Sequence, residues 1–192
     1  KPWGADGMEL TGTLWAVDLN SELVFAGDQG TTQIRGASRR RGLEVGARGP
    51  IRGPLSFNGS VTWTKAEFTN GNAIPLAPEL TAYGAAIVKW PVGLTTQLQA
   101  TYLGVRPLTE NKSLKSPSWL TFDLSTRYQL PVKLERGRLE AFLFVQNLFD
   151  TKWEQAMFAF QSRLQSEAAG VTDSHVVPGT PRMFMGGMAW YF

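Results

Sequence analysis

Few side chains in this sequence have the types and spacing that catalysis or metal binding requires. The 192 residues contain no cysteine and one histidine, His175, so neither a thiolate nor a pair of imidazoles is available as metal ligands. Asp150 has no base or nucleophile near it in the sequence, and no phosphate-binding glycine loop or Gly-x-Ser-x-Gly pattern occurs. We therefore expect a protein that is not an enzyme and has neither a metal site nor a cofactor.

The clearest cluster of charge is Arg39 to Arg41, in a chain whose formal net charge is +3. A surface that follows a nucleic-acid backbone needs many more cations than three. We interpret the cluster as a solvated loop or strand end and expect no nucleic-acid partner.

Alternation of apolar and polar residues indicates β-strands that have two different faces. After Ser118, Leu120, Phe122 and Leu124 fall on one face, whereas Thr121 and Asp123 fall on the other. Eight strands are predicted, and they begin near Leu10, Thr32, Leu55, Thr81, Leu94, Leu120, Leu139 and Met183. Some are long enough for the ~9 to 11 residues of a tilted membrane-spanning strand.

The connections between these strands alternate in length. Segments 49–54, 90–93 and 130–137 are short, whereas segments 66–79, 106–117 and 150–182 are longer and richer in polar or turn residues. Barrels of the bacterial outer membrane have short turns on the periplasmic rim and long loops on the outer rim. The alternation is typical of an up-and-down barrel.

Hydropathy agrees with strands rather than helices. No run approaches the ~20 apolar residues of a membrane-spanning helix. The mean hydropathy of −0.16 is what a barrel gives when lipid-facing and interior residues are averaged. The sequence ends with Trp190 and Phe192 on one face, as in an aromatic girdle. We predict an all-β, antiparallel, up-and-down transmembrane barrel with its short turns on the periplasmic side.

Four motifs resemble, in order, the last strands of TonB-dependent outer-membrane receptors. Asn147, Leu148, Phe149 and Asp150 end a strand and precede Lys152 and Trp153. The other three are Gly42 and Glu44 in a Ser-x-x-x-Gly-x-Glu strand, the Pro-x-Ala-Pro turn that ends at Pro78, and Pro181-Arg182 before the strand that closes on Phe192. Asn147 and Asp150 are expected to bond backbone groups where the strand opens into a loop, and Phe149 to pack at the membrane interface.

The resemblance implies a place in the outer membrane of a Gram-negative bacterium. Residues 1–192 would form a single C-terminal region, about eight strands of a barrel of some 22, without the N-terminal plug and the remaining strands. The first residues lack a methionine and a leader-like apolar segment, so we expect a processed chain or one cut from a longer chain.

The same resemblance implies the partners of the protein. It would import a scarce extracellular ligand, such as a ferric siderophore, haem, cobalamin or a carbohydrate, with energy from TonB delivered through the missing N-terminal region. Outer-membrane lipid and lipopolysaccharide would surround the barrel. The barrel-assembly machinery would bind the C-terminal strand.

In this family extracellular loops meet the ligand, which makes the segment 150–182 the candidate contact region. Its candidate ligand-binding residues are Trp153, Phe158, Phe160, Arg163 and His175. A second explanation for the aromatic residues of this segment is that a strand of the barrel extends beyond the membrane there. A short helix is expected over 161–169. Arg106, Lys112 and Lys115 could attract an anionic siderophore or lipopolysaccharide phosphates.

Two alternatives remain open at this point. One is a self-contained eight-stranded outer-membrane barrel with a structural or adhesive role. Its interior face would need charges that pair with one another, and these could come from Arg48, Asp123, Arg127 and Glu140. The other is a soluble lipocalin-like or sandwich protein that binds a small apolar ligand. An open sheet in lipid is excluded because each unpaired backbone group costs several kcal/mol.

Overall fold

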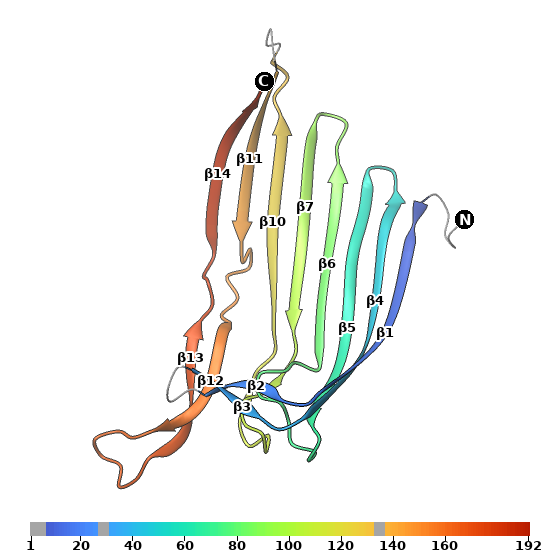
Figure 1. Cartoon of the computed structure of the whole chain (residues 1–192). Coiled ribbons are helices and arrows are strands. Elements are labelled where there is room, and N and C mark those ends of the chain that lie inside the picture. The colour runs from blue at the N-terminus through green and yellow to red at the C-terminus, as the bar shows by residue number, and fades with distance from the viewer. Residues whose placement is uncertain (1–6, 27–30, 133–136) are drawn as a thin grey trace.

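The computed structural model describes residues 7–26, 31–132 and 137–192, and one antiparallel sheet dominates it (Figure 1). The sheet contains eight strands in the order β1, β4, β5, β6, β7, β10, β11, β14. Their bounds are β1 Glu9–Leu19, β4 Ser38–Arg52, β5 Leu55–Phe68, β6 Leu80–Lys89, β7 Leu94–Leu103, β10 Trp119–Gln129, β11 Arg138–Gln146 and β14 Met183–Tyr191. The predicted all-β, antiparallel, up-and-down architecture is confirmed.

The register of the strands separates the two faces of this sheet, because directly opposed residues project to the same side. One row runs across five strands through Val45, Val61, Ala82, Tyr102 and Leu120. Apart from Arg52, which opposes Leu55 beside the β4–β5 turn, this face carries no charged residue from the row of Leu43 to the short turns, and we call it the uncharged face.

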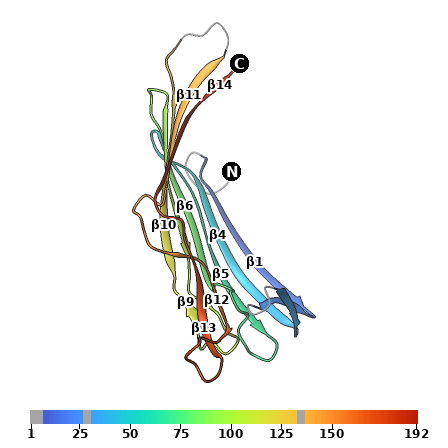
Figure 2. The ribbon, with the colours of Figure 1, turned by 90° about the vertical axis from the view of Figure 1, so that its left-hand side faces the viewer.

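The opposite face is polar and carries the charges of the strands over these same rows. A row on this side runs through Asn58, Ala85, Gln99 and Asp123. Seen from the side, the described strands form a single twisted layer (Figure 2). Two such different surfaces on one layer are expected where one side meets lipid and the other meets a polar interior.

The lengths of the connections sort them onto opposite ends of the sheet, as predicted. The turns β4–β5, β6–β7 and β10–β11 lie at the end that also holds the C-terminus, which we call the short-turn end (Figure 1). The longer connections gather at the other end, the long-connection end (Figure 1). They contain the short ladders β2 Glu22–Ala26 with β3 Thr31–Arg35, β8 Arg106–Pro107 with β9 Lys115–Ser116, and β12 Glu154–Ser162 with β13 Val171–Pro178.

Two predictions about the long connections are wrong. The second strand of the main sheet begins at Ser38 rather than near Thr32, because the segment at Thr32 pairs locally with β2. The helix expected over 161–169 is absent from this described segment: Gln161 and Ser162 pair with Thr172 and Val171. That pairing uses the backbone groups which a helix would need for its own hydrogen bonds.

Deeply buried apolar side chains gather at the long-connection end, where three lie in the connections and Phe68 ends β5 beside them. Phe68, Ala73, Ile74 and Leu108 are only 3 to 5% exposed. By contrast, Leu14 on the uncharged face is 83% exposed. The long connections therefore form a packed body above the sheet, whereas much of the described uncharged face is exposed.

The edges of the sheet stay open in the described part of the chain. β1 pairs only with β4 and β14 only with β11, and the two strands lie at opposite edges (Figure 1). The closed eight-stranded barrel considered from the sequence is therefore not the observed arrangement. No helix within the described ranges has the length and apolarity needed to cross a membrane.

Candidate functional site

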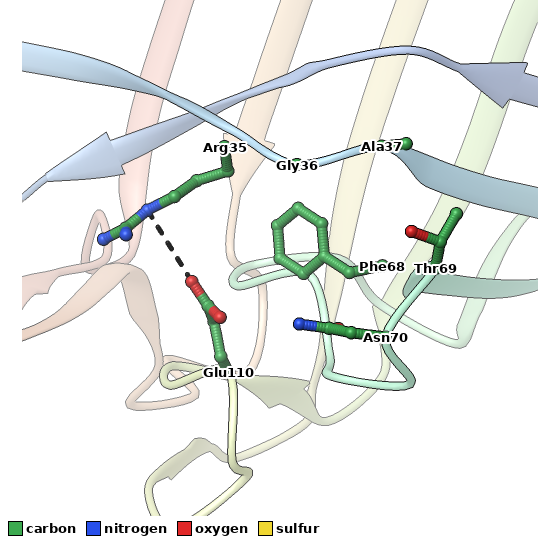
Figure 3. A pocket seen from close by; sticks show the side chains of 7 residues that line it. All are labelled: Arg35, Gly36, Ala37, Phe68, Thr69, Asn70 and Glu110. Carbon is green, nitrogen blue, oxygen red and sulfur yellow. Dashed lines mark ion pairs between the residues drawn. The ribbon is translucent and has the colours of Figure 1, made fainter.

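A pocket of about 240 Å³ lies among the long connections, between the segment after β3, the end of β5 and the loop before β9 (Figure 3). Its lining residues are Arg35, Gly36, Ala37, Phe68, Thr69, Asn70 and Glu110. The Nε of Arg35 lies 3.7 Å from the Oε1 of Glu110 across this pocket, and the two side chains are 50% and 33% exposed. The site thus offers one cation, one carboxylate and a buried aromatic wall.

Hydrogen bonds of the β5–β6 loop hold this pocket in shape. The Oδ1 of Asn70 accepts from the backbone N–H of Asn72 at 3.0 Å, and Asn72 Nδ2 donates to Glu110 Oε2 at 3.2 Å. The backbone N–H of Ala73 also donates to the Glu110 carbonyl oxygen at 2.9 Å. Side-chain capping of this kind is how asparagine stabilises tight turns. Glu110 is therefore fixed by its own backbone as well as by two side chains.

A larger pocket of about 350 Å³ also borders the β5–β6 loop. Its lining residues are Ala66, Ala73, Ala77, Glu79, Val105, Pro107, Lys112 and Lys115. Two ammonium groups against one carboxylate favour an anionic occupant. Lys112 and Lys115, which the sequence put forward as attractors of an anion, thus border one cavity.

Arg106 does not share this accessible position, because it is only 8% exposed. Its Nη2 donates to the Oγ of the buried Ser116 at 2.9 Å, whereas its Nε has no partner among the described residues. Burial lowers the pKa of Arg106 from its ordinary value, and the charge of Glu154 opposes that shift. The expectation that Arg106 attracts a ligand from solution is therefore wrong for this structure.

The five residues proposed as ligand contacts all lie on or beside the β12–β13 hairpin, but they do not converge on one cavity. Phe160 stacks on His175 with ring centroids 3.6 Å apart and planes 8° apart, and Phe158 is the register partner of His175. Arg163 lies near the tip, where its Nε donates to the Glu167 carbonyl oxygen at 3.0 Å. Trp153 lies at the base of the hairpin.

The base of this hairpin is built from the Asn147 to Asp150 motif. Asn147 is 1% exposed, and both Asn147 and Asp150 have positive φ, 50° and 53°. The Nδ2 of Asn147 donates to the carbonyl oxygens of Thr151 and Thr180, and Asp150 Oδ1 accepts from the Arg182 N–H at 3.0 Å. The backbone bonds expected of Asn147 and Asp150 are therefore present.

Aromatic contacts flank this junction on both faces of the sheet. Phe149 is 63% exposed and meets Phe122 of the uncharged face edge-on at 5.2 Å, while the Leu148 N–H donates to the Phe122 carbonyl oxygen. On the polar side, Trp153 packs against Trp119 at 4.6 Å and donates from Nε1 to the Thr180 carbonyl oxygen at 3.2 Å. Trp153 therefore serves the junction and lines neither loop pocket.

The other motif residues lie apart from these sites. Gly42 and Glu44 lie on the polar face of β4, and the backbone carbonyl of Trp63 would lie 2.7 Å from a Cβ at Gly42. Pro78 is half-buried in the β5–β6 loop, and Pro181 is exposed before β14. Phe192 is 96% exposed at the short-turn end.

Sequence reasoning missed Arg35, Phe68 and Glu110, which line the smaller pocket. Arg35 and Glu110 are separated by 75 positions in the numbering, so spacing gives no sign of their contact. The Asn-Gly-Asn run at 70–72 was the available signal, because it predicts a tight turn that would bring Phe68 back toward Ile74. Among the described residues, no three or more His, Asp or Glu side chains come together as a metal site would require.

Comparison with known proteins agrees with this architecture. The family model for the TonB dependent receptor-like β-barrel matches residues 1–148. Among solved structures, the siderophore receptor PiuA from Acinetobacter baumannii has a TM-score of 0.65 and 18% identity, over 95% of this chain and 26% of that one. The closed form of the ferric-catecholate import receptor Fiu from Escherichia coli K12 has a TM-score of 0.66 and 21% identity, over 96% and 25%.

The copper transporter OprC gives a TM-score of 0.69 and 18% identity, over 97% of this chain and 30% of that one. The chain therefore spans only 25 to 30% of the length of these structures, and identities this low establish the fold. Comparison with curated proteins gives no match. Because the family model covers residues 1–148 and the sheet has the same fold as these receptors, this chain belongs to the TonB-dependent receptor-like β-barrel family.

Proposed function

We propose that residues 1–192 form part of the wall and outer vestibule of an outer-membrane receptor that imports a scarce ligand by TonB-dependent transport. The observation that carries the proposal is the joining of two parts: a sheet with one uncharged, exposed face and, at its long-connection end, a packed loop body with two pockets. The first part fits passage through a bilayer, and the second fits capture of a ligand outside it.

The open edges of the sheet support a larger barrel. Unpaired backbone groups in lipid are costly, so β1 and β14 need further strands beside them in the membrane. In the proposed arrangement the wall continues from both edges and encloses a plug region, through which TonB delivers energy. The barrel-assembly machinery recognises β14 and its terminal aromatic residue.

We infer that the imported ligand is anionic and of the siderophore class. Lys112 and Lys115 border the larger pocket, and Arg35 faces the smaller one. Pockets of 240 and 350 Å³ hold only part of a siderophore-sized ligand, so other loops of the receptor complete the site. The hairpin residues Trp153, Phe158, Phe160, Arg163 and His175 are proposed as further contacts from this side.

Ligand titration of the purified receptor in detergent tests this function, with tryptophan fluorescence as the readout. The probes are ferric citrate, a ferric tris-catecholate, haemin, cyanocobalamin and a maltodextrin. Saturable quenching by one of the two ferric chelates is expected. The double variant K112Q/K115Q should weaken that binding up to about thirtyfold, since each of the two exposed charge contacts contributes up to ~1 kcal/mol.

The matched control is R52Q/K89Q, which removes two cations at the short-turn end and should bind the chelate normally. Saturable binding of haemin, cobalamin or maltodextrin alone would replace the siderophore class with another. Failure of a folded receptor to bind any of the five probes would overturn the proposal.

A further inference from the structure

Two cations lie directly opposite each other where the uncharged face ends. Arg41 of β4 and Lys65 of β5 are register partners, and the next pair toward the membrane is Leu43 with Trp63. Both cationic side chains are exposed, that of Lys65 by 61%. The change from an uncharged surface to two cations occurs within two residues of each strand, roughly 7 Å.

Opposed like charges destabilise an antiparallel pair unless another group neutralises them. Within the described ranges Arg41 makes no ion pair, whereas Lys65 Nζ lies 3.1 Å from Glu67 Oε2. One row farther from the membrane, Arg39 Nε lies 3.8 Å from Asp18 Oδ1. The acidic partners thus lie on the outer row, and the excess positive charge lies on the row next to the uncharged face.

The position of this row corresponds to the headgroup level of a bilayer. Trp63 is 50% exposed on the uncharged face, and tryptophan is enriched where hydrocarbon meets headgroups. Leu14 and Leu43, at the same level as Trp63, are 83% and 40% exposed and offer an apolar surface to acyl chains. A phosphate above those chains would meet the guanidinium of Arg41 and the ammonium of Lys65.

We propose that Arg41 and Lys65 form a binding site for a phosphorylated glycolipid of the outer leaflet, of the lipopolysaccharide class. Arg41 presents a planar fork of donors that suits a phosphate, and Lys65 adds a point charge. Arg39 lies at the periphery of the site. The occupant belongs to the membrane and not to the transported ligand, so this site is independent of what the receptor imports.

Lipid binding by the purified receptor tests this site, with native mass spectrometry in detergent as the readout and bisphosphorylated lipid A as the probe. The variant R41Q/K65Q should bind lipid A about tenfold or more weakly, because each cation near a headgroup contributes on the order of 1 kcal/mol. The charge-conserving variant R41K/K65R should retain most of the binding. Lipid A without its phosphates should bind wild type and R41Q/K65Q equally.

The matched control is K112Q/K115Q, which removes the same charge from the loop pocket. An equal loss of lipid A in K112Q/K115Q would overturn the proposal in favour of general electrostatic attraction. Unchanged binding by R41Q/K65Q would overturn it directly. Siderophore binding is measured on the same samples, so failure of the lipid site and failure of ligand uptake are told apart.

Discussion

The Nδ2 of Asn147 donates a hydrogen bond of 3.0 Å to the carbonyl oxygen of Thr180, 33 positions later in the chain. The same amide group donates to the Thr151 carbonyl oxygen at 2.8 Å and accepts from the Thr151 N–H at 2.9 Å. One buried side chain therefore joins the segment that leaves β11 to the segment that returns into β14. The β12–β13 hairpin begins and ends at this junction.

Replacement of Asn147 by alanine should loosen this hairpin while the main sheet remains folded. The change removes three hydrogen bonds and deprives the part-buried backbone N–H and carbonyl of Thr151 of their side-chain partner, which costs about 2 to 4 kcal/mol. We expect faster proteolysis within 154–178 and a lower unfolding temperature of the receptor in detergent. Asn58→Ala, at an exposed position of the polar face, is the control. Equal proteolysis of both variants would show that the junction does not depend on Asn147.

Gly42 lies beneath the indole of Trp15, and its replacement by alanine should displace that ring. A Cβ at Gly42 would overlap the Trp15 side chain and approach the Trp63 carbonyl oxygen to 2.7 Å. Overpacking of this kind costs typically ~1 to 3 kcal/mol. The expected result is a lower unfolding temperature and a changed tryptophan emission spectrum. Gly12→Ala is the matched control, because nothing lies within 4 Å of a Cβ there, and an equal effect of both changes would contradict this explanation.

The main sheet could be predicted from the sequence because alternation is a local property of each strand. Seven of the predicted starts, near Leu10, Leu55, Thr81, Leu94, Leu120, Leu139 and Met183, fall within one residue of observed strands of the sheet. The start near Thr32 was wrong because alternation cannot tell which partner a strand will take. That segment pairs with β2 at the long-connection end.

The candidate site was less predictable because its contacts join distant segments. The ion pair of Arg35 with Glu110 depends on how three connections pack together, which no periodicity encodes. The hairpin aromatics were chosen by residue type within a loop that the family resemblance indicated, and the structure places Trp153 against Trp119 at the junction, away from Phe160 and His175. Residue type indicated the region, and tertiary packing decided the role.

Removal of the Glu22 carboxylate should destabilise the start of the β2–β3 hairpin. Glu22 is 8% exposed, and its two oxygens accept 2.7 Å hydrogen bonds from Ser38 Oγ and Arg40 Nη2. Glu22→Ala leaves the half-buried Arg40 without its ion pair, and we expect a loss of about 2 kcal/mol. Hydrogen exchange of backbone amides in 22–24 and 32–40 measures the effect. Glu9→Ala, which breaks the exposed pair with Arg48, should change exchange at its own site far less.

Deletion of Phe192 should impair assembly of the protein into the outer membrane, and Phe192→Ala should have a milder effect. Phe192 is 96% exposed, and its ring lies 5.6 Å from that of Trp190, so it contributes an accessible aromatic surface at the end of the open edge strand β14. A partner can bind an edge strand by adding a strand to its sheet, and β14 offers such an edge. Deletion shortens the segment that follows Tyr191, whose ring lies beneath the Arg138 guanidinium at 4.6 Å, whereas the alanine variant keeps its length. The measurement is the amount of heat-modifiable barrel in outer-membrane fractions, with Phe149→Ala as a control that removes an exposed aromatic at the other end of the sheet. Normal amounts of assembled barrel after the deletion would count against a role for Phe192, and equal losses in the control would assign the effect to membrane-facing aromatics in general.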